Sequence, residues 1–284
     1  MLDMAKGITE GAGKNRTDDT TDPGKIRLFT HLTPESPRGS VLLSHGFGEH
    51  QGRYARFVAA LNDAGYDAYT FDYTGHGTSS GPRARVDVAS LIEEHLVARK
   101  QVMRVLRTEK LDLFGHSMGG LITLASALLQ PTHLAAVAVT GPALSPLPTV
   151  NPFVARLGLK AARLFPAISS VALDDTLLSK DPAVIDAYRA DPLVFEGKVP
   201  LLTGASMVVQ GQRVIENASI LAVPTLIVHG DKDGLANLVG SEEFVAASRG
   251  KAELVVAEGG FHELLNEPEH EEYTDLIIQW YDRW

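Results

Sequence analysis

Short apolar runs alternate with longer amphipathic stretches along most of this chain, and that alternation limits its possible folds more than any other feature. The apolar or β-branched runs are residues 25–32, 39–46, 66–73, 110–117, 134–141, 223–230 and 251–258. Between some of them, residues 53–65 and 90–110 repeat apolar positions at the spacing of an α-helix. Strands that alternate with helices form βαβ units and a mainly parallel sheet flanked by helices. The sequence therefore predicts an α/β fold, with functional side chains at the carboxyl ends of the strands.

One long segment interrupts the alternation. Residues 142–222 separate two predicted strands by far more chain than a normal connection, and they begin proline-rich and continue with helical patterns. We interpret this segment as a helical insertion over the carboxyl edge of the sheet and call it the cap segment. The core then consists of residues 25–141 and 223–284. Residues 1–24 are polar and glycine-rich, which is typical of a mobile N-terminal tail.

Within the cap segment, residues 151–165 have the pattern of an amphipathic helix. The helix has two faces, an apolar one with Phe153, Leu157, Ala161 and Leu164 and a basic one with Arg156, Lys160 and Arg163. The pattern is typical of a helix packed on the core with a solvated basic face. It is also typical of a helix whose apolar face meets lipid while its basic face meets head groups. The second interpretation predicts transient contact with a membrane surface.

Charge and composition exclude several classes of protein. A net charge of −9 over 284 residues, without a run of lysine or arginine, argues against a nucleic-acid partner. The chain has no cysteine, which excludes a disulfide framework and a thiolate zinc site. We see neither the apolar core of a signal peptide nor an apolar stretch long enough to span a membrane. These features predict a cytoplasmic protein, peripheral at a membrane if the cap helix meets lipid, and they do not indicate its oligomeric state.

The segment GHSMGG, residues 115–120, contains the pattern G-x-S-x-G. In a nucleophile elbow this pattern places the serine on a tight turn between a strand and a helix, and the small flanking residues relieve crowding. A plain glycine–serine turn would give the same match. Here an apolar run precedes the motif and a helix-like apolar pattern follows it, so we predict that Ser117 is a nucleophile.

A serine hydroxyl needs a base, and the base needs an orienting acid. In the order typical of this elbow the acid and then the histidine follow the serine along the chain. His262 lies in a loop after the last predicted strand, and Asp231 and Asp233 lie just past the strand before it. We favour Asp233 as the acid, with Asp231 bracing the turn. His229 lies inside its predicted strand and is interpreted as structural.

A tetrahedral oxyanion needs hydrogen-bond donors, and the loop after the predicted strand at 39–46 is placed to supply one. The backbone amides of Phe47 and Met118 are the candidates. Gly46 and Gly48 in the same loop imitate a dinucleotide-binding fingerprint, but the third glycine is misplaced. The histidines show no metal-ligand spacing such as HExxH. We therefore expect neither a metal nor an organic cofactor.

Together these segments resemble the serine α/β-hydrolases of the monoacylglycerol lipase and lysophospholipase type. The likeness covers nearly everything after about residue 25. Its motifs are HGFGEHQGRY, FDYTGHGTSSGPRARV, GHSMGG, LLSKDPAVIDAYRADPLVFEGKVP, VHGDKD and GGFHELLNEP. The resemblance implies the α/β-hydrolase fold with a helical cap. It also implies a nucleophile at Ser117, a base at His262, an acid at Asp233 and oxyanion donors at Phe47 and Met118.

The same resemblance implies contacts to the alcohol end of the substrate at Glu49, Arg53 and Tyr188. Chemically, a carboxylate, a guanidinium and a phenol can bind the hydroxyls of a polar head group. Glu49 and Arg53 could equally pair with each other or brace their loop. The chain also departs from the better-known animal members of the family, because HELLNEP has leucine where those carry a second histidine.

These observations predict an enzyme that cleaves carboxylic esters of fatty acids through an acyl-enzyme, with monoacylglycerols as the first candidate substrate. A lysophospholipid, a short soluble ester or an amide would use the same triad. A receptor-like protein that keeps the fold but performs no catalysis is the alternative of another class, since fold alone does not fix function.

Overall fold

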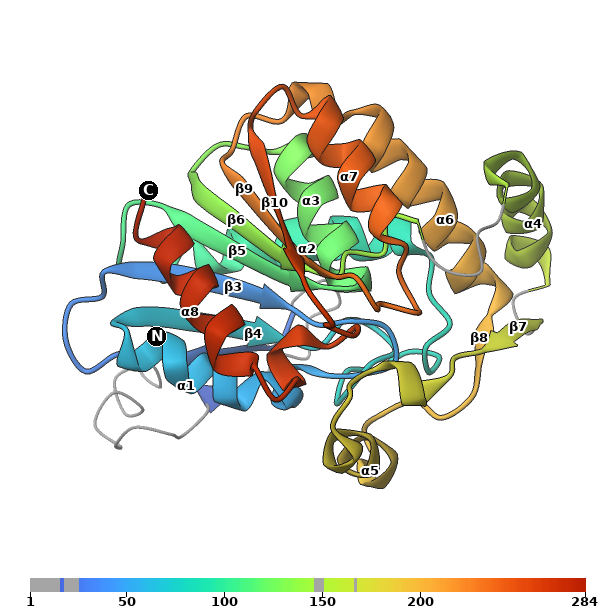
Figure 1. The fold of residues 1–284 in the computed structure, drawn as a ribbon, viewed down its shortest axis with the longest axis horizontal. Helices are drawn as coiled ribbons and strands as arrows, with labels where there is room; N and C mark the ends of the chain where they lie inside the picture. The colour runs from blue at the N-terminus through green and yellow to red at the C-terminus, as the bar shows by residue number, and fades with distance from the viewer. Residues whose placement is uncertain (1–15, 18–25, 146–150, 166–167) are drawn as a thin grey trace.

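A computed structural model of the chain describes residues 16–17, 26–145, 151–165 and 168–284. Within these residues one eight-stranded sheet forms the centre of the molecule (Figure 1). In spatial order its strands are β1 (Arg16–Thr17), β2 (Leu28–His31), β4 (Tyr66–Phe71), β3 (Gly39–Ser44), β5 (Leu111–His116), β6 (Leu134–Thr140), β9 (Thr225–Gly230) and β10 (Ala252–Ala257).

The sheet is mainly parallel, as the sequence predicts. Each neighbouring pair from β4 to β10 is parallel, and only β2, near one edge, runs antiparallel to both of its neighbours, β1 and β4. Strands β3, β4, β5 and β9 are buried along their whole length. Strands covered on both faces need continuous apolar runs rather than alternating ones, which explains the runs in the sequence.

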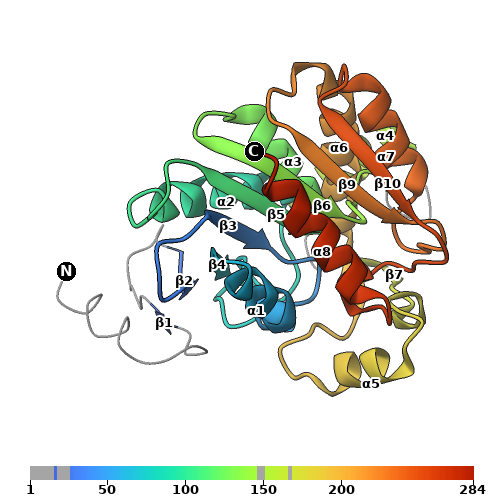
Figure 2. The same cartoon turned by 60° about the vertical axis from the view of Figure 1, so that its left-hand side comes forward.

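Helices cover both faces of the sheet (Figures 1 and 2). On one face, the hydrophobic core joins the sheet to α2 (Val88–Val102), α3 (Met118–Leu129), α6 (Leu201–Glu216) and α7 (Leu238–Ala247). On the other face, a second hydrophobic cluster joins it to α1 (Ala55–Asp63) and α8 (His270–Tyr281). The two layers fix the sheet rigidly and leave its carboxyl edge for the functional loops.

The cap segment lies beyond that edge, at the right of Figure 1. Its described elements are α4 (Pro152–Leu164), β7 (Ser169–Ala172), η2 (Asp175–Leu177), α5 (Pro182–Ala190), β8 (Lys198–Pro200), α6 and η3 (Ala218–Ile220). Strands β7 and β8 form a small antiparallel sheet of their own. Helix α6 also packs against α3 and α7, so this part of the segment contributes to the core.

Hydrogen bonds fasten the α5 side of the cap segment to the core. The backbone amide of Phe195 donates to the Gly48 carbonyl at 2.6 Å. The amide of Glu263 donates to the Leu178 carbonyl at 2.8 Å. The loop after β3 and the loop after β10 are therefore each bonded to the cap segment.

Helix α4 forms where the amphipathic pattern predicts it, but the predicted apolar face is exposed. Phe153, Leu157 and Leu164 are 67%, 53% and 75% exposed, and Ala161 is exposed as well. The helix packs on α6 through a different stripe, which consists of Ala155, Leu159 and Ala162. The prediction that this apolar face packs on the core is therefore wrong. The stripe on the opposite side, which includes two alanines, packs closely on α6 instead.

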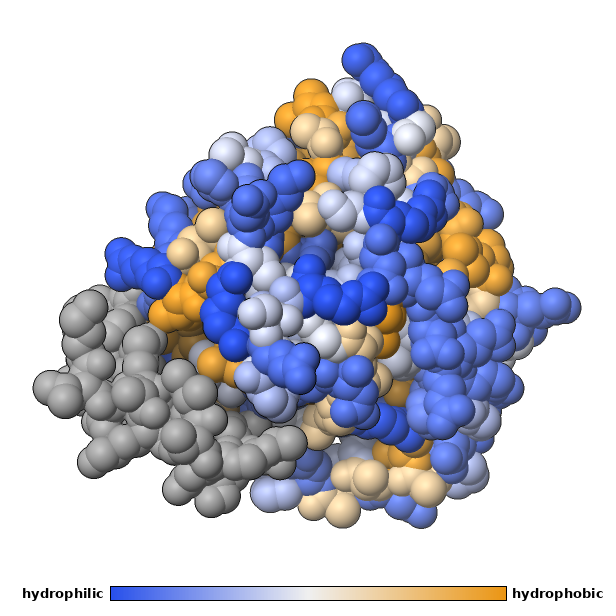
Figure 3. Space-filling model, turned by 90° about the vertical axis from the view of Figure 1, so that its left-hand side faces the viewer, coloured by the Kyte–Doolittle hydropathy of each residue, from blue (hydrophilic) through white to orange (hydrophobic). Residues whose placement is uncertain are grey.

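The face turned away from the cap segment is mostly hydrophilic, with apolar side chains in small separate groups (Figure 3). None of the helices among the described residues has the length and apolar character needed to cross a membrane. Of the tail expected at residues 1–24, Arg16 and Thr17 form β1 against β2, and the other residues lie outside the described part of the chain.

Candidate active site

Ser117 lies on a tight turn between β5 and α3, with a φ of 53°. The left-handed conformation of a non-glycine residue is strained and requires support from its surroundings. The support is close packing of the backbone. A side chain at Gly119 would collide with the carbonyl oxygens of Ser44 and His45, and one at Gly115 would collide with the Gly119 carbonyl. Gly119 thus lets the turn lie directly against the end of β3, and Gly115 lets α3 lie directly against β5.

A continuous chain of hydrogen bonds starts at this serine. The Ser117 hydroxyl Oγ donates to His262 Nε2 at 2.9 Å, and His262 Nδ1 donates to Asp233 Oδ2 at 2.7 Å. The three residues come from the β5–α3 turn, the loop after β10 and the loop after β9. The structure thus brings together the three residues that were predicted from the sequence as nucleophile, base and acid.

Asp233 is held as a carboxylate. Its Oδ1 accepts hydrogen bonds from the amides of Leu235 and Ala236, and its Oδ2 lies 3.2 Å from His229 Nε2. Burial alone would raise the pKa of Asp233, but His262 and His229 outweigh burial and lower that pKa far below its usual range. His229 therefore contacts the acid, a role that its position inside a strand did not reveal.

Asp231, the other carboxylate considered for the role of the acid, is bonded to a different part of the loop after β10. Its Oδ1 accepts a hydrogen bond from the amide of Gly259 at 2.6 Å, and its side chain is partly exposed. It joins the loop after β9 to the turn after β10.

Buried charges also act on His262. Burial lowers the pKa of His262, while Asp233, Glu263 and Glu49 raise it, and the net shift is upward. The imidazole is thus a stronger base than a free histidine. It also lies 4.7 Å, between ring centroids, from His116, whose own pKa burial lowers to about 4.

The amides of Phe47 and Met118 are both free to bind a ligand. Neither N–H donates to any protein group among the described residues. Met118 is the first residue of α3, so its amide lies at the positive end of the helix dipole. Phe47 lines the same cavity as Ser117. Two unused donors thus lie at the serine.

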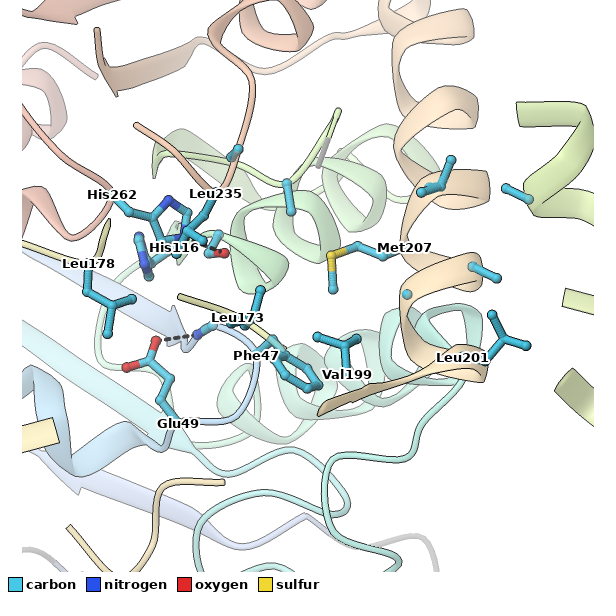
Figure 4. A pocket seen from close by; sticks show the side chains of 18 of the residues that line it. Phe47, Glu49, His116, Leu173, Leu178, Val199, Leu201, Met207, Leu235 and His262 are labelled. Atoms are coloured by element: carbon cyan, nitrogen blue, oxygen red, sulfur yellow. Dashed lines mark hydrogen bonds between the residues drawn. The ribbon is translucent and has the colours of Figure 1, made fainter. Parts of the chain in front are cut away.

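The cavity that contains Ser117 has a volume of about 290 Å³. Most of its wall is apolar, and the side chains come from α4, β8, α6 and the loops around them. Figure 4 shows Met207, Val199 and Leu201 of the cap segment on one side, and the carboxylate of Glu49 on the other side together with His262 and His116. The cavity thus has a mainly apolar wall and a smaller polar part at Glu49, which we call the polar end.

Ion pairs build the polar end. Arg53 Nη1 donates to Glu49 Oε2 at 2.8 Å and to Glu263 Oε1 at 2.6 Å, and Arg53 Nη2 donates to Glu263 Oε2 at 2.8 Å. The guanidinium also lies 4.8 Å from the ring centre of Tyr188. Glu49, Glu263 and Tyr188 line the cavity, whereas Arg53 lies behind them. Arg53 was predicted to contact substrate, but its hydrogen bonds are directed to the two glutamates.

The sequence motifs did not identify Glu263 as a site residue. The only available signal was its position immediately after His262, which brings any side chain there close to the triad. No group of three or more histidine, cysteine, aspartate or glutamate side chains in the described residues is arranged to hold a metal ion.

The sequence model of a hydrolase family described as serine aminopeptidase, S33 matches residues 35–269. The chain belongs to this family. It is 35% identical to the monoacylglycerol lipase of Mycolicibacterium smegmatis, over 90% of this chain and 93% of that one. It is 30% identical to the monoglyceride lipase of Rattus norvegicus, over 88% and 82%.

A solved relative shares the fold as well. The crystal structure of the monoacylglycerol lipase of Paleococcus ferrophilus superimposes with a TM-score of 0.80 at 32% identity, covering 90% of this chain and 98% of that one. The protein is a serine hydrolase with the α/β-hydrolase fold, and its relatives place it among the carboxylic ester hydrolases.

Proposed function

We propose that this protein is a monoacylglycerol lipase, which cleaves a monoacylglycerol into a fatty acid and glycerol. The observation that carries the proposal is the position of Ser117 in the cavity. Most of the wall of this cavity is apolar and suits an acyl chain, and the polar end, with Glu49, Glu263 and Tyr188, suits a small alcohol. The names of the relatives in M. smegmatis, R. norvegicus and P. ferrophilus support the same substrate class.

In the proposed mechanism, His262 takes the proton of Ser117 as the serine oxygen attacks the ester carbonyl. The amides of Phe47 and Met118 bind the resulting oxyanion, and Asp233 stabilises the imidazolium. His262 then protonates the departing glycerol oxygen, which leaves the acyl group on Ser117. A water molecule, deprotonated by the same histidine, attacks the acyl-enzyme and releases the fatty acid.

The glycerol would lie at the polar end, with its hydroxyls donating to Glu49 and accepting from the Tyr188 hydroxyl. In this arrangement Arg53 acts indirectly, because its guanidinium holds Glu49 in place and lies against the Tyr188 ring.

Residues 142–222 form the proposed cap, and its outer surface supports contact with lipid. The exposed side chains of Phe153, Leu157 and Leu164 face away from the core, as a membrane-binding surface requires. The basic residues beside them are partly neutralised. Arg163 pairs with Asp87 at 2.7 Å, and Arg156 lies 3.8 Å from Glu216. We therefore propose that the cap binds a lipid surface mainly through its apolar side chains and places the enzyme at a membrane periphery.

The proposed function is tested by measuring fatty-acid release from monoacylglycerols, lysophospholipids and p-nitrophenyl esters. We expect monoacylglycerol turnover that disappears in Ser117→Ala. Turnover of short esters alone would be consistent with the proposed triad but would contradict the proposal of a lipid substrate. A folded protein without activity, and without labelling of Ser117 by a fluorophosphonate, would instead favour a receptor-like binder.

A further inference from the structure

The polar end of the cavity carries more negative charge than a site for glycerol needs. Two carboxylates, Glu49 and Glu263, form its wall, and no lysine or arginine lines the cavity among the described residues. Since the proposed reaction requires only hydroxyl contacts at this end, the second carboxylate needs another explanation.

We propose that Glu263, together with Glu49, makes the site selective for uncharged polyol head groups by excluding phosphate-bearing ones. This inference rests on the proposed function and names the head-group specificity of that same site. It makes Glu263 a specificity-determining residue.

The first support is the charge balance. The single guanidinium of Arg53 forms ion pairs with two carboxylates, so the three groups together carry a charge of −1. The side chains of Glu49 and Glu263 are only 4% and 5% exposed, so water screens this charge poorly. Burial alone would raise the pKa of Glu49, but Arg53 and the neighbouring histidines outweigh burial and lower it, which keeps this carboxylate ionised.

The second support is the position of the positive charge. Both Nη atoms of Arg53 donate to the glutamates, and the guanidinium lies against the ring of Tyr188. A phosphate that enters the cavity would meet carboxylate oxygens before it could reach the guanidinium. Like charges at such contact cost several times more in a buried site than in water.

The third support is hydrogen-bonding capacity. Each carboxylate oxygen can accept two hydrogen bonds. Among the described residues, Glu49 Oε2 and Glu263 Oε1 each accept one, both from Arg53 Nη1. Each therefore has capacity for the O–H of a polyol. A phosphate dianion has no hydrogen to donate to them.

Glu263 is also held in place. Its Oε2 accepts from Arg53 Nη2 and from Asn266 Nδ2 at 2.9 Å, and its backbone amide is bonded to Leu178. The carboxylate therefore has little freedom to turn away from an incoming anion. Exclusion by a fixed charge is a common means of specificity.

The experiment compares two substrates with the same acyl chain and ester bond, 1-oleoylglycerol and 1-oleoylglycerol 3-phosphate. We expect the wild type to prefer the neutral substrate by at least about 100-fold in kcat/KM. Glu263→Gln should reduce that preference about tenfold or more, since it removes one poorly screened unit charge. Glu263→Asp retains the charge and should keep most of the preference. Glu258→Gln removes the same charge from an exposed position in the same loop and should leave the preference unchanged.

A second measurement does not depend on which lipid the enzyme hydrolyses. Dodecyl phosphate and the dodecyl ether of glycerol are compared as inhibitors of p-nitrophenyl butyrate hydrolysis. We expect the ether to bind at least about tenfold more tightly than the phosphate in the wild type, and the difference to shrink in Glu263→Gln. This comparison remains decisive in the wild type even where a variant does not fold.

Equal use of the two substrates, equal inhibition by the two amphiphiles, or an unchanged preference in folded Glu263→Gln would each overturn the inference. The proposed function would survive these results as long as 1-oleoylglycerol is hydrolysed. Conversely, a wild type that cleaves p-nitrophenyl butyrate but no monoacylglycerol would overturn the proposed function, and the inhibitor pair would still decide the charge selectivity.

Discussion

Helices α3 and α4 are both rich in apolar residues, but their surroundings differ. Helix α4 lines the cavity directly, whereas α3 is connected to it through Ser117, the residue just before the helix. Helix α3 carries Ser117 at its start and is buried along nearly all of its length. Helix α4 contacts the protein through a narrow stripe and exposes its larger apolar side chains. The difference indicates that the proposed nucleophile is supported by a buried element, while an exposed element is available for the proposed contact with lipid.

The largest effect is expected at the start of α3. Replacing Ser117 by alanine should reduce kcat for any ester at least about 10⁴-fold, because an intact base and acid have no nucleophile to activate. The residue is exposed in the cavity, so the melting temperature should stay close to that of the wild type. Residual turnover above one part in a thousand, with contaminating esterases excluded, would remove Ser117 as the nucleophile.

Alanine at one glycine in each helix sharpens the comparison. At Gly119 the new methyl group would collide with the Ser44 and His45 carbonyls, and we expect a loss of about 3 kcal/mol or more in unfolding free energy. At Gly158 in α4 the described residues place no atom within 4 Å of the new methyl group, apart from the helix's own backbone and the adjoining residues. There alanine should stabilise the protein by about 0.5–1 kcal/mol, because it favours helix more than glycine does.

Urea unfolding of the two variants measures this contrast. Similar free-energy changes in both would mean that α3 is not packed against β3 as closely as described. A strong loss in Gly158→Ala would mean that α4 has further neighbours.

The pH dependence of kcat/KM is expected to report the charges around the α3 end of the cavity. His262 must be neutral to act as a base, and its pKa is raised above the ordinary 6.5. Activity should therefore fall about tenfold per pH unit below that raised pKa. Glu263 is one of the groups that raise the pKa of His262. Glu263→Gln should therefore shift the low-pH side of the activity profile, its acid limb, to lower pH, and Glu258→Gln should leave it in place. A limb that stays in place or moves upward in Glu263→Gln would contradict this electrostatic account.

The smallest effect is expected on the exposed face of α4. Serine in place of Phe153, Leu157 and Leu164 should weaken binding to phospholipid vesicles about tenfold or more, through loss of apolar contact. Hydrolysis of a soluble ester and the melting temperature should not change.

Alanine in place of Arg156, Lys160 and Arg163 is the matched variant, and it should weaken vesicle binding less, since two of the three side chains already face acidic partners. Vesicle co-sedimentation compares the two variants. A larger effect of the basic set would show that charge, rather than apolar contact, attaches the cap.

Much of the fold was predictable because local pattern and final surroundings agree. The buried strands are continuous apolar runs, and the elbow motif lies between such a run and a buried helix. The predicted helix at 90–110 was too long, since α2 ends at Val102 and Arg107 then pairs with the buried Asp67. Periodicity does not reveal such a partner distant in sequence.

The parts that the sequence did not predict depend on which neighbours the fold supplies. Helix α4 has apolar residues on both sides, so its sequence pattern allows either side to be buried. The stripe that packs against α6 determines which side is buried. Glu263 acquires its role from Arg53, 210 residues away in the sequence, and His229 acquires its role from the turn after β9, which brings Asp233 back onto its ring. Motifs identify the reacting groups, whereas the charges that tune those groups come from tertiary contacts.

The fastening of the α5 side of the cap segment to the core has a practical consequence for exchanging sequence between relatives. The bonds at Leu178 and Phe195 tie this side to the loops that carry His262 and Phe47, the proposed base and one proposed oxyanion donor. A chimera that replaces residues 178–195 would therefore disturb the reacting groups along with the cavity. One that replaces residues 151–165 would leave both bonds in place. If the acyl chain binds along α4 as proposed, residues 151–165 are thus the segment at which new chain-length preferences can be introduced.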